Sequence, residues 1–170
     1  HGPYAYGVDY REGGQHPRYF RTPRDGGEKR VLIDGDALAE GKAYFQVGAV
    51  DPSPSHDFLL WSYDDKGSEY YTIRIRNPES LEDLPDMIEG TGGDGCFSAD
   101  GHGFWYIQLD ENHRPAKLFF HEIGKPASDD RLIFENTDAG FFMSVDDSPL
   151  NDWIVLSLHD HETSECYLIP

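Results

Sequence analysis

An apolar strand preceded by a short polar turn occurs three times along the chain, and this repeat constrains the fold most. Each turn is rich in Asp, Ser, Pro or Gly, and the strands that follow cover residues 58–63, 104–107 and 153–158. When the three repeats are aligned with one another, Trp61, Tyr106 and Leu156 occupy the same position, so the repeats are 45 and 50 residues apart. A period of about 40–50 residues with four strands per unit is typical of β-propeller blades.

Turn residues divide the whole chain into short strands with one short helix. The first 43 residues predict a hairpin pair across Gly13-Gly14, a third strand at 29–33 and a helix over 36–40 with Asp36 as its N-cap. Further strands are expected at 44–50, 58–63, 70–75, 84–88, 95–98, 103–109, 116–123, 131–134, 141–145, 153–158 and 165–169. The predicted fold class is all-β, a partial β-propeller of about three blades with four antiparallel strands each.

The expected organisation is one propeller piece over residues 1–170. The opening hairpin and helix occupy 1–43, the first full blade 44–89, the second blade 94–135 and a partial third blade 140–170. A β-sandwich is the competing fold, because it also places strands every 8–12 residues or so. A sandwich does not predict that the same polar turn recurs before the same apolar strand.

Too few blades are present to close a ring. Blades bury their faces against neighbouring blades, and the smallest closed propellers have about four of them. We therefore expect an arc with open ends that belongs to a larger protein. The open edges could also allow self-association.

The charge of the chain restricts its partners. Its 170 residues carry 32 acidic and 14 basic side chains, a net charge of −18, and residues 86–170 hold 17 of the acidic and only 4 of the basic ones. We expect no nucleic-acid partner, because phosphate contacts need a positive surface. No apolar stretch is long enough to span a membrane, so no membrane partner is expected. The acidic half could attract cationic ligands, or it could simply maintain solubility.

Two cysteines do not make a disulfide framework. Cys96 and Cys166 each lie in an apolar run. Buried free thiols and a reducing, cytoplasmic compartment are therefore the expectation.

The familiar motifs of catalysis and metal binding are missing or have a simpler explanation. There is no Gly-x-Ser-x-Gly elbow, although a triad on another scaffold stays open. His159-Asp160-His161 could offer metal ligands but fits a hairpin turn better, and the acidic pairs 64–65, 129–130 and 146–147 lack the spacing of a calcium loop. We predict no catalytic residue, no metal site and no cofactor.

Two other segments are explained by structure more simply than by ligand binding. The glycine-rich segment 90–95 is followed by a strand rather than a helix, so it predicts a close-packed crossing between blades and not a phosphate loop. The aromatic residues of 104–106 and 119–120 alternate along strands, which predicts that half of them are core.

The loop at 110–115 is the most distinctive segment. Asp110, Glu111, His113 and Arg114 place four ionisable groups within five positions, and Pro115 stiffens the strand that follows. Arg114 could pair with Asp110 or Glu111. We predict a polar contact between blades or between domains, with direct ligand contact as the alternative.

These same residues carry a family resemblance. The segments that carry it are 13–17 with Arg21, 38–41 followed by 44–48, 88–93, and 110–115 followed by 118–121. Together they resemble the propeller of oligopeptidase B (protease II) in the prolyl oligopeptidase family of serine peptidases. The chain departs from the family pattern at His16, where Tyr is common, and at Gly95-Cys96, which replace a more ordinary inner strand.

The resemblance implies a seven-bladed propeller packed on a C-terminal α/β-hydrolase domain, which holds the Ser, Asp and His of the triad. It also implies cleavage of short peptides after Arg or Lys. About three of the seven blades are covered and no triad residue has a counterpart here. The chain is thus expected to be a non-catalytic lid that contacts the hydrolase domain and restricts substrate size. A stand-alone binding or scaffold module is the alternative, and a hydrolase with a non-standard site is a third possibility.

Overall fold

A computed structural model describes residues 2–136, 142–147, 154–159 and 164–169, with side chains through residue 136. Within these residues nearly every element is a strand. The elements are β1 (Tyr4–Tyr10), β2 (Pro17–Pro23), β3 (Arg30–Asp34), α1 (Gly35–Ala39), β4 (Gln46–Pro52), β5 (Leu59–Asp64), β6 (Tyr71–Arg76), β7 (Asp83–Phe97), β8 (Gly103–Leu109), β9 (Pro115–Glu122), the short 3-10 helix η1 (Ala127–Asp129), β10 (Arg131–Glu135), β11 (Phe142–Asp147), β12 (Ile154–His159) and β13 (Ser164–Ile169).

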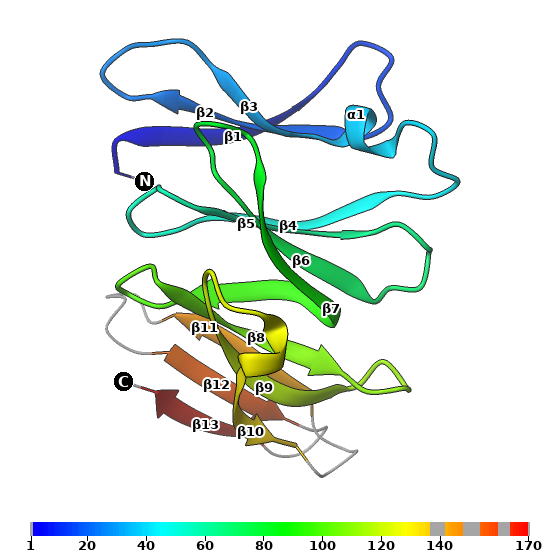
Figure 1. Cartoon of the computed structure of the whole chain (residues 1–170), viewed down its shortest axis with the longest axis vertical. Coiled ribbons are helices and arrows are strands. Elements are labelled where there is room, and N and C mark those ends of the chain that lie inside the picture. The colour runs from blue at the N-terminus through cyan, green and yellow to red at the C-terminus, as the bar shows by residue number, and fades with distance from the viewer. Residues whose placement is uncertain (1, 137–141, 148–153, 160–163, 170) are drawn as a thin grey trace.

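The strands form three antiparallel sheets that follow one another in chain order. Their strand orders are β1-β2-β3, β10-β9-β8-β7-β6-β5-β4 and β11-β12-β13. Figure 1 shows the first sheet at the top, the seven-stranded sheet from the middle to the bottom, and the third sheet at the height of β8, β9 and β10. Each of the predicted strands overlaps an observed one, and the predicted fold class, a partial β-propeller, is confirmed.

One long strand joins the two halves of the seven-stranded sheet. The first half of β7 pairs with β6 through Ile88↔Ile73, and the second half pairs with β8 through Gly95↔Tyr106. We call β4, β5, β6 and the first half of β7 the first unit, and the second half of β7 with β8, β9 and β10 the second unit. The glycine-rich segment, expected as a crossing between two strands, is therefore the middle of a single strand.

Two glycines with positive φ angles allow β7 to change its pairing partner at its centre. Gly90 has a φ of 73° and Gly93 one of 95°, a region that favours glycine. Thr91 lies between them and pairs with both Tyr71 and Gln108. Its hydroxyl donates to the Tyr71 carbonyl (2.9 Å) and accepts from the Gly93 amide (3.0 Å). The Thr91 side chain thereby fixes the point at which the strand leaves one unit for the next.

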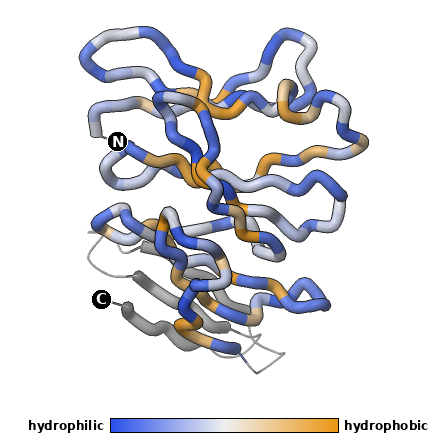
Figure 2. The backbone as a smooth tube through the Cα atoms, viewed as in Figure 1, coloured by the Kyte–Doolittle hydropathy of each residue, from blue (hydrophilic) through white to orange (hydrophobic). Residues whose placement is uncertain are grey.

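Strand β5 is buried on both faces, and its alternation builds two cores. Leu59 and Trp61 join a cluster between the first sheet and the first unit, whose other buried members are Leu32, Ile33, Phe45 and Val47. Leu60 joins a second cluster, between the two units, with Ile73, Ile75, Ile88, Phe104 and Tyr106. Each fully buried aliphatic or aromatic side chain contributes about 1.5–3 kcal/mol. Figure 2 shows hydrophobic residues along the strands and hydrophilic ones in the loops at the sides.

The aromatic residues of 104–106 alternate in burial as predicted, but Phe119 and Phe120 do not. Phe104 and Tyr106 are buried in the second core, whereas Trp105, Phe119 and Phe120 are half-buried. Cys96 is also half-buried, which corrects the expectation of a buried thiol. The side chains of Cys166 and of the 146–147 pair, and the side chains of the 159–161 segment, lie outside the described part of the chain.

The helix begins one residue earlier than predicted and has a different cap. Asp34, at the end of β3, accepts a hydrogen bond from the Ala37 amide (3.3 Å) and is the N-cap. The Asp36 carboxylate instead accepts hydrogen bonds from the backbone N–H groups of Gln15 (3.1 Å) and His16 (3.0 Å), and so holds the β1–β2 loop in place. In the described residues, no helix has the length and apolar character needed to cross a bilayer.

Candidate functional site

The loop between β8 and β9 is closed on itself by Asp110. Its carboxylate accepts hydrogen bonds from the backbone N–H groups of Asn112 (2.8 Å) and Arg114 (3.0 Å). The Arg114 bond, followed by the Asn112 bond, lowers the pKa of Asp110. The hydrogen bonds that the structure gives between Asp110 and Arg114 thus involve the Arg114 backbone, although pairing through its guanidinium was expected. Glu111 is exposed and makes no hydrogen bond or ion pair within the described part of the chain.

Asp110 and His113, both predicted site residues, contact the first unit. The Tyr70 hydroxyl donates to the Asp110 carbonyl (2.6 Å). The His113 ring lies over the Tyr70 ring, with 3.9 Å between centroids, and its Nε2 atom contacts the Ser68 carbonyl. His113 has a φ of 62°, a strained value for a non-glycine residue. The structure therefore brings Asp110 and His113 against the β5–β6 loop and leaves Glu111 at the surface.

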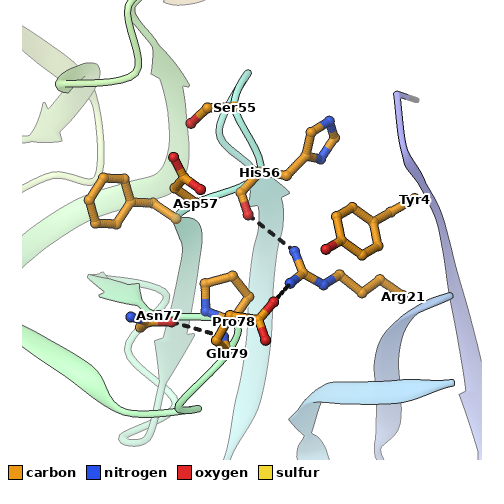
Figure 3. Close-up of a pocket in the computed structure, with 9 residues that line it drawn as sticks. Tyr4, Arg21, Ser55, His56, Asp57, Asn77, Pro78 and Glu79 are labelled. Carbon is orange, nitrogen blue, oxygen red and sulfur yellow. Dashed lines mark hydrogen bonds and ion pairs between the residues drawn. The ribbon is translucent and has the colours of Figure 1, made fainter. Parts of the chain in front are cut away.

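A pocket of about 360 Å³ lies where the first sheet meets the first unit. It is lined by Tyr4 on β1, Arg21 on β2, the β4–β5 loop residues Ser55, His56, Asp57 and Phe58, and the β6–β7 loop residues Asn77, Pro78 and Glu79. Figure 3 shows the Arg21 side chain reaching from its strand between the Tyr4 ring and these loops.

Arg21 is the central charge of this pocket. Its side chain is only 3% exposed, and it donates to the Glu79 carboxylate (2.6 Å) and to the His56 carbonyl (3.1 Å). Its guanidinium carbon lies 3.9 Å from the centroid of the Tyr4 ring. An arginine held by an anion, a carbonyl and an aromatic face is a strong positional contact. Arg21 therefore ties the first sheet to two loops of the first unit.

The pocket contains no activated nucleophile. His56 Nδ1 is hydrogen-bonded to the Tyr6 hydroxyl (2.7 Å), and the Ser55 hydroxyl contacts that of Ser53 (3.4 Å). Burial, with the charge of Arg21 adding to it, lowers the pKa of His56. A serine nucleophile needs a histidine within hydrogen-bond reach, and here the histidine is directed elsewhere. The third possibility, a non-standard hydrolase site, gains no support from this pocket.

A buried polar cluster that the sequence did not reveal lies between the two units. The His121 ring has 2.6 Å contacts to the Asp86 carboxylate through Nε2 and to the Asp130 carboxylate through Nδ1. The Tyr106 hydroxyl donates to Asp130 (2.5 Å), and the Gly124 amide donates to Asp86 (2.9 Å). Burial raises the pKa of Tyr106 far above its ordinary value, helped by the hydrogen bond to Asp130 and by the charge of that carboxylate.

No local sequence pattern marks these residues. Asp129-Asp130 had been expected to be a turn pair, and Asp130 does follow η1, but its carboxylate is 2% exposed. Asp86 and His121 are 35 residues apart, and neither belongs to a motif. A comparison of the third strands of the two units could have pointed to His121, because it occupies the position that Arg76 has in the first unit. Among residues 2–136, no group of three potential metal ligands is placed to hold an ion.

Comparison with known proteins assigns the family. The family model described as prolyl oligopeptidase, N-terminal beta-propeller domain, matches residues 1–170. Dipeptidyl aminopeptidase BI from Pseudoxanthomonas mexicana is 32% identical over 143 residues, which are 84% of this chain and 20% of that protein. Protease 2 from Moraxella lacunata is 28% identical over 178 residues, covering 99% of this chain and 26% of that protein.

Solved structures agree with this assignment. Oligopeptidase B from Leishmania major superposes with a TM-score of 0.93 at 28% identity, over 98% of this chain and 24% of that one. Oligopeptidase B from Trypanosoma brucei, in a closed form with covalently bound antipain, superposes with a TM-score of 0.90 at 29% identity. The match covers 99% of this chain and 24% of that one. The chain thus spans about a fifth to a quarter of these relatives. It belongs to the prolyl oligopeptidase family of peptidases, as part of the N-terminal β-propeller domain.

Proposed function

We propose that this chain is the front part of the propeller of an oligopeptidase B-like serine peptidase that hydrolyses short peptides after Arg or Lys. The likeness to oligopeptidase B carries the proposal, with TM-scores of 0.93 and 0.90 at 28% and 29% identity. Prolyl endopeptidases, prolyl oligopeptidase B from Galerina marginata and a post-proline cleaving enzyme from Rickettsia typhi share the fold at only 13–17% identity.

The piece itself acts as a non-catalytic lid in this proposal. Its opening hairpin and helix take up 1–43, its blades cover 44–89 and 94–135, and a partial blade covers 140–170. Its main partner is the hydrolase domain of the same parent protein. A folded chain cannot pass a narrow opening, whereas a short peptide enters when the two domains part. Closure then keeps water and bulky competitors from the reacting groups.

The acidic half of the chain would assist by attracting basic peptides. Residues 86–170 hold 17 acidic and 4 basic side chains. Glu89 and Asp94, on either side of the bend in β7, are both exposed. Such a surface raises the encounter rate of cations at low ionic strength. In the full-length protein, kcat/KM for an Arg peptide should fall as salt is added, and the slope should flatten in a Glu89→Lys, Asp94→Lys variant. An unchanged slope would remove this part of the proposal.

The specificity is tested with the full-length protein and a matched set of peptides. Peptides with Arg or Lys before the cleaved bond should give a kcat/KM at least about a hundredfold above that of the same peptide with Pro. Preferential cleavage after Pro would contradict the proposal. So would release of dipeptides from the N-terminus without regard to a basic residue.

A stand-alone binding or scaffold module is the second candidate, and the free edge of β1 bears on it. Within the described residues β1 pairs only with β2, while Val8 and Tyr10 on it are 55% and 60% exposed. An edge of this kind invites pairing with another strand. Light scattering on the 170-residue chain distinguishes the two candidates. A compact monomer favours the module, whereas association that Val8→Lys and Tyr10→Lys abolish favours a severed propeller piece with an open edge.

A further inference from the structure

Four aspartates of the chain are followed directly by a glycine, and this pair of residues has a reactivity of its own. They are Asp25, Asp34, Asp94 and Asp100. Because glycine carries no side chain, its backbone nitrogen can approach the carboxyl group of the residue before it. The sequence alone does not distinguish the four pairs, so a difference in reactivity between them must come from the folded structure.

The reaction converts aspartate to isoaspartate through a five-membered ring. The glycine nitrogen attacks the Asp Cγ atom and forms a C–N bond, while the amide hydrogen and the carboxyl hydroxyl leave as water. Water then adds to one of the two ring carbonyls. Breaking the bond to Cγ restores aspartate, whereas breaking the bond to the backbone carbonyl leaves a chain that runs through Cβ and Cγ. The carboxyl group must be free to rotate, and so must the peptide that follows it.

Asp34 is fixed on both counts. Its carboxylate accepts a hydrogen bond from the Ala37 amide (3.3 Å) and binds the Arg11 guanidinium. The next residue, Gly35, is buried, and a Cβ atom built on it would lie 2.6 Å from the His16 Cβ atom. The peptide between Asp34 and Gly35 therefore has no room to turn.

Asp100 is fixed by hydrogen bonds within its turn. Its carboxylate accepts from the Ser98 hydroxyl (2.6 Å) and the His102 amide (2.9 Å), and the Gly101 amide donates to the Ser98 carbonyl (2.9 Å). The Ser98 bond, followed by the His102 bond, lowers the pKa of Asp100. The carboxyl group is thus kept ionised, without a hydroxyl to lose, and is turned away from the Gly101 nitrogen.

Asp94 has an exposed side chain but a fixed backbone. It lies inside β7, where the next residue, Gly95, pairs with Tyr106 of β8. A Cβ atom on Gly95 would lie 2.5 Å from the Leu60 Cδ1 atom, so the strand is closely packed there. Rotation of this peptide would break the pairing between β7 and β8.

Asp25 has none of these restraints. It lies in the connection between β2 and β3, where residues 24–30 are all exposed. Its carboxylate makes no hydrogen bond or ion pair within the described part of the chain. A Cβ atom on Gly26 would meet nothing within 4 Å, and the Gly26 amide donates to the Pro23 carbonyl over a long 3.3 Å. Both the carboxyl group and the following peptide are therefore free to move.

We propose that Asp25–Gly26 is a site of spontaneous isoaspartate formation, and that the fold protects the other three pairs. The product has one more carbon in the backbone of the β2–β3 turn, and its carboxylate is attached to Cα. Arg21 and Arg30, which hold the β6–β7 loop, lie on the strands beyond this turn. The modified chain should therefore stay folded and accumulate. The inference does not depend on the substrate of the peptidase.

Ageing of the full-length protein at pH 7.4 and 37 °C tests the proposal. A glutamyl endopeptidase releases peptides 13–28, 29–40 and 90–111, which contain the four pairs. Electron-transfer fragmentation in a mass spectrometer distinguishes isoaspartate from aspartate at each position. Asp25 should isomerise at least about tenfold faster than each of the other three, because they react only after local opening. Equal rates at the four positions, or a faster reaction at one of the other three, would overturn the proposal.

Three controls separate the effect of the fold from that of neighbouring residues. In urea the four pairs should react at rates within about threefold of one another, because unfolding removes the protection. Asp25→Glu, which would need a six-membered ring, should remove the modification from peptide 13–28 and leave the other peptides unchanged. Ser98→Ala removes the hydroxyl that binds Asp100 and should speed the reaction there several-fold, with Asp25 unaffected.

Each control also has a result that refutes the proposal. If Asp25 keeps its tenfold lead in urea, the neighbouring residues and not the fold select the site. An unchanged rate at Asp100 in Ser98→Ala would show that hydrogen bonding of the carboxylate does not protect it. If Ser98→Ala does not fold, the comparison of folded and unfolded wild-type protein decides alone.

Discussion

Trp61 donates its indole N–H to the Asp83 carboxylate over 2.9 Å, and this contact joins the second strand of the first unit to the fourth. In the second unit the Tyr106 hydroxyl reaches Asp130 in the same way. An aromatic residue with a polar tip can be buried when that tip has a partner. Each unit therefore pairs a large core side chain with an acid at, or just before, the start of its last strand.

Replacement of Trp61 by phenylalanine should show the value of this contact. Trp61 is 3% exposed, and the variant loses both its hydrogen bond and part of its core volume. We expect the free energy of unfolding to fall by about 2–4 kcal/mol in urea titrations. Trp105→Phe is the matched control, because this ring is half-buried against Phe120, and should cost less than about 1.5 kcal/mol. Similar losses for the two variants would contradict the role given to Asp83.

Tyr106 should make the free energy of unfolding fall at alkaline pH. Burial, the hydrogen bond to Asp130 and that carboxylate's charge raise the pKa of Tyr106 above its ordinary value of 10.0. Its contribution to stability is complete below the pKa of the unfolded chain and is lost as the pH rises beyond it, because the unfolded chain releases the proton first. Tyr106→Phe should be less stable at pH 8, and the difference should narrow toward pH 11. A Tyr44→Phe variant, at an exposed ring, should follow the wild type.

Asp64 should stabilise the β5–β6 turn in its ionised form. Burial acts to raise the pKa of Asp64, but backbone N–H donors from Lys66, Glu69, Ser68 and Gly67 outweigh it and lower the pKa below the ordinary 3.8. The stabilisation is present above that value and is lost as the pH falls through the folded pKa. Asp64→Asn should cost about 2 kcal/mol at pH 7, and the difference should shrink toward pH 3.

Asp65 supplies the control for that measurement. It is adjacent in sequence, but its carboxylate is 34% exposed and lies 3.7 Å from Lys42. A surface ion pair of this kind contributes about 0–1 kcal/mol. Asp65→Asn should therefore have a small effect at either pH. An effect as large as that of Asp64→Asn would show that general surface charge, and not the turn, sets the stability.

Replacement of His113 tests the contact between the loops of the two units. His113→Ala removes the ring that lies over Tyr70 and should speed cleavage after Glu111 by a glutamyl endopeptidase by several-fold. His113→Asn tolerates a positive φ but lacks the ring, so it separates backbone strain from side-chain contact. Equal cleavage of both variants assigns the effect to the contact. Cleavage at the wild-type rate in both would leave the 110–114 loop without a positioning role.

Much of the fold could be predicted because strand alternation and turn chemistry are local. A period of two predicted that half of the aromatic residues in 104–106 are core, which Phe104 and Tyr106 are, and β8 was placed at residues 103–109 as observed. The helix cap was predicted wrongly because Asp34 and Asp36 are both good caps two residues apart. The choice depended on the amides of Gln15 and His16, which only the folded β1–β2 loop brings to Asp36.

The buried charges could not be predicted from local patterns. In the sequence, the neighbours of Asp86 and Asp130 are those of ordinary surface acids, and His121 lies in a strand rich in aromatic residues. Their burial depends on pairing between units, which no single segment encodes. The loop at 110–114 stood out because its ionisable residues are crowded, yet the partners of Asp110 and His113 are Tyr70 and Ser68, some 40 and 45 residues earlier.

The shared strand β7 has a practical consequence for anyone who dissects this domain. Its fifteen residues are at once the last strand of one unit and the first of the next. Neither unit can lose β7 without exposing the strands of the other unit that pair with it. We therefore expect both units to unfold in a single thermal transition. A boundary anywhere inside β7 would leave two damaged fragments.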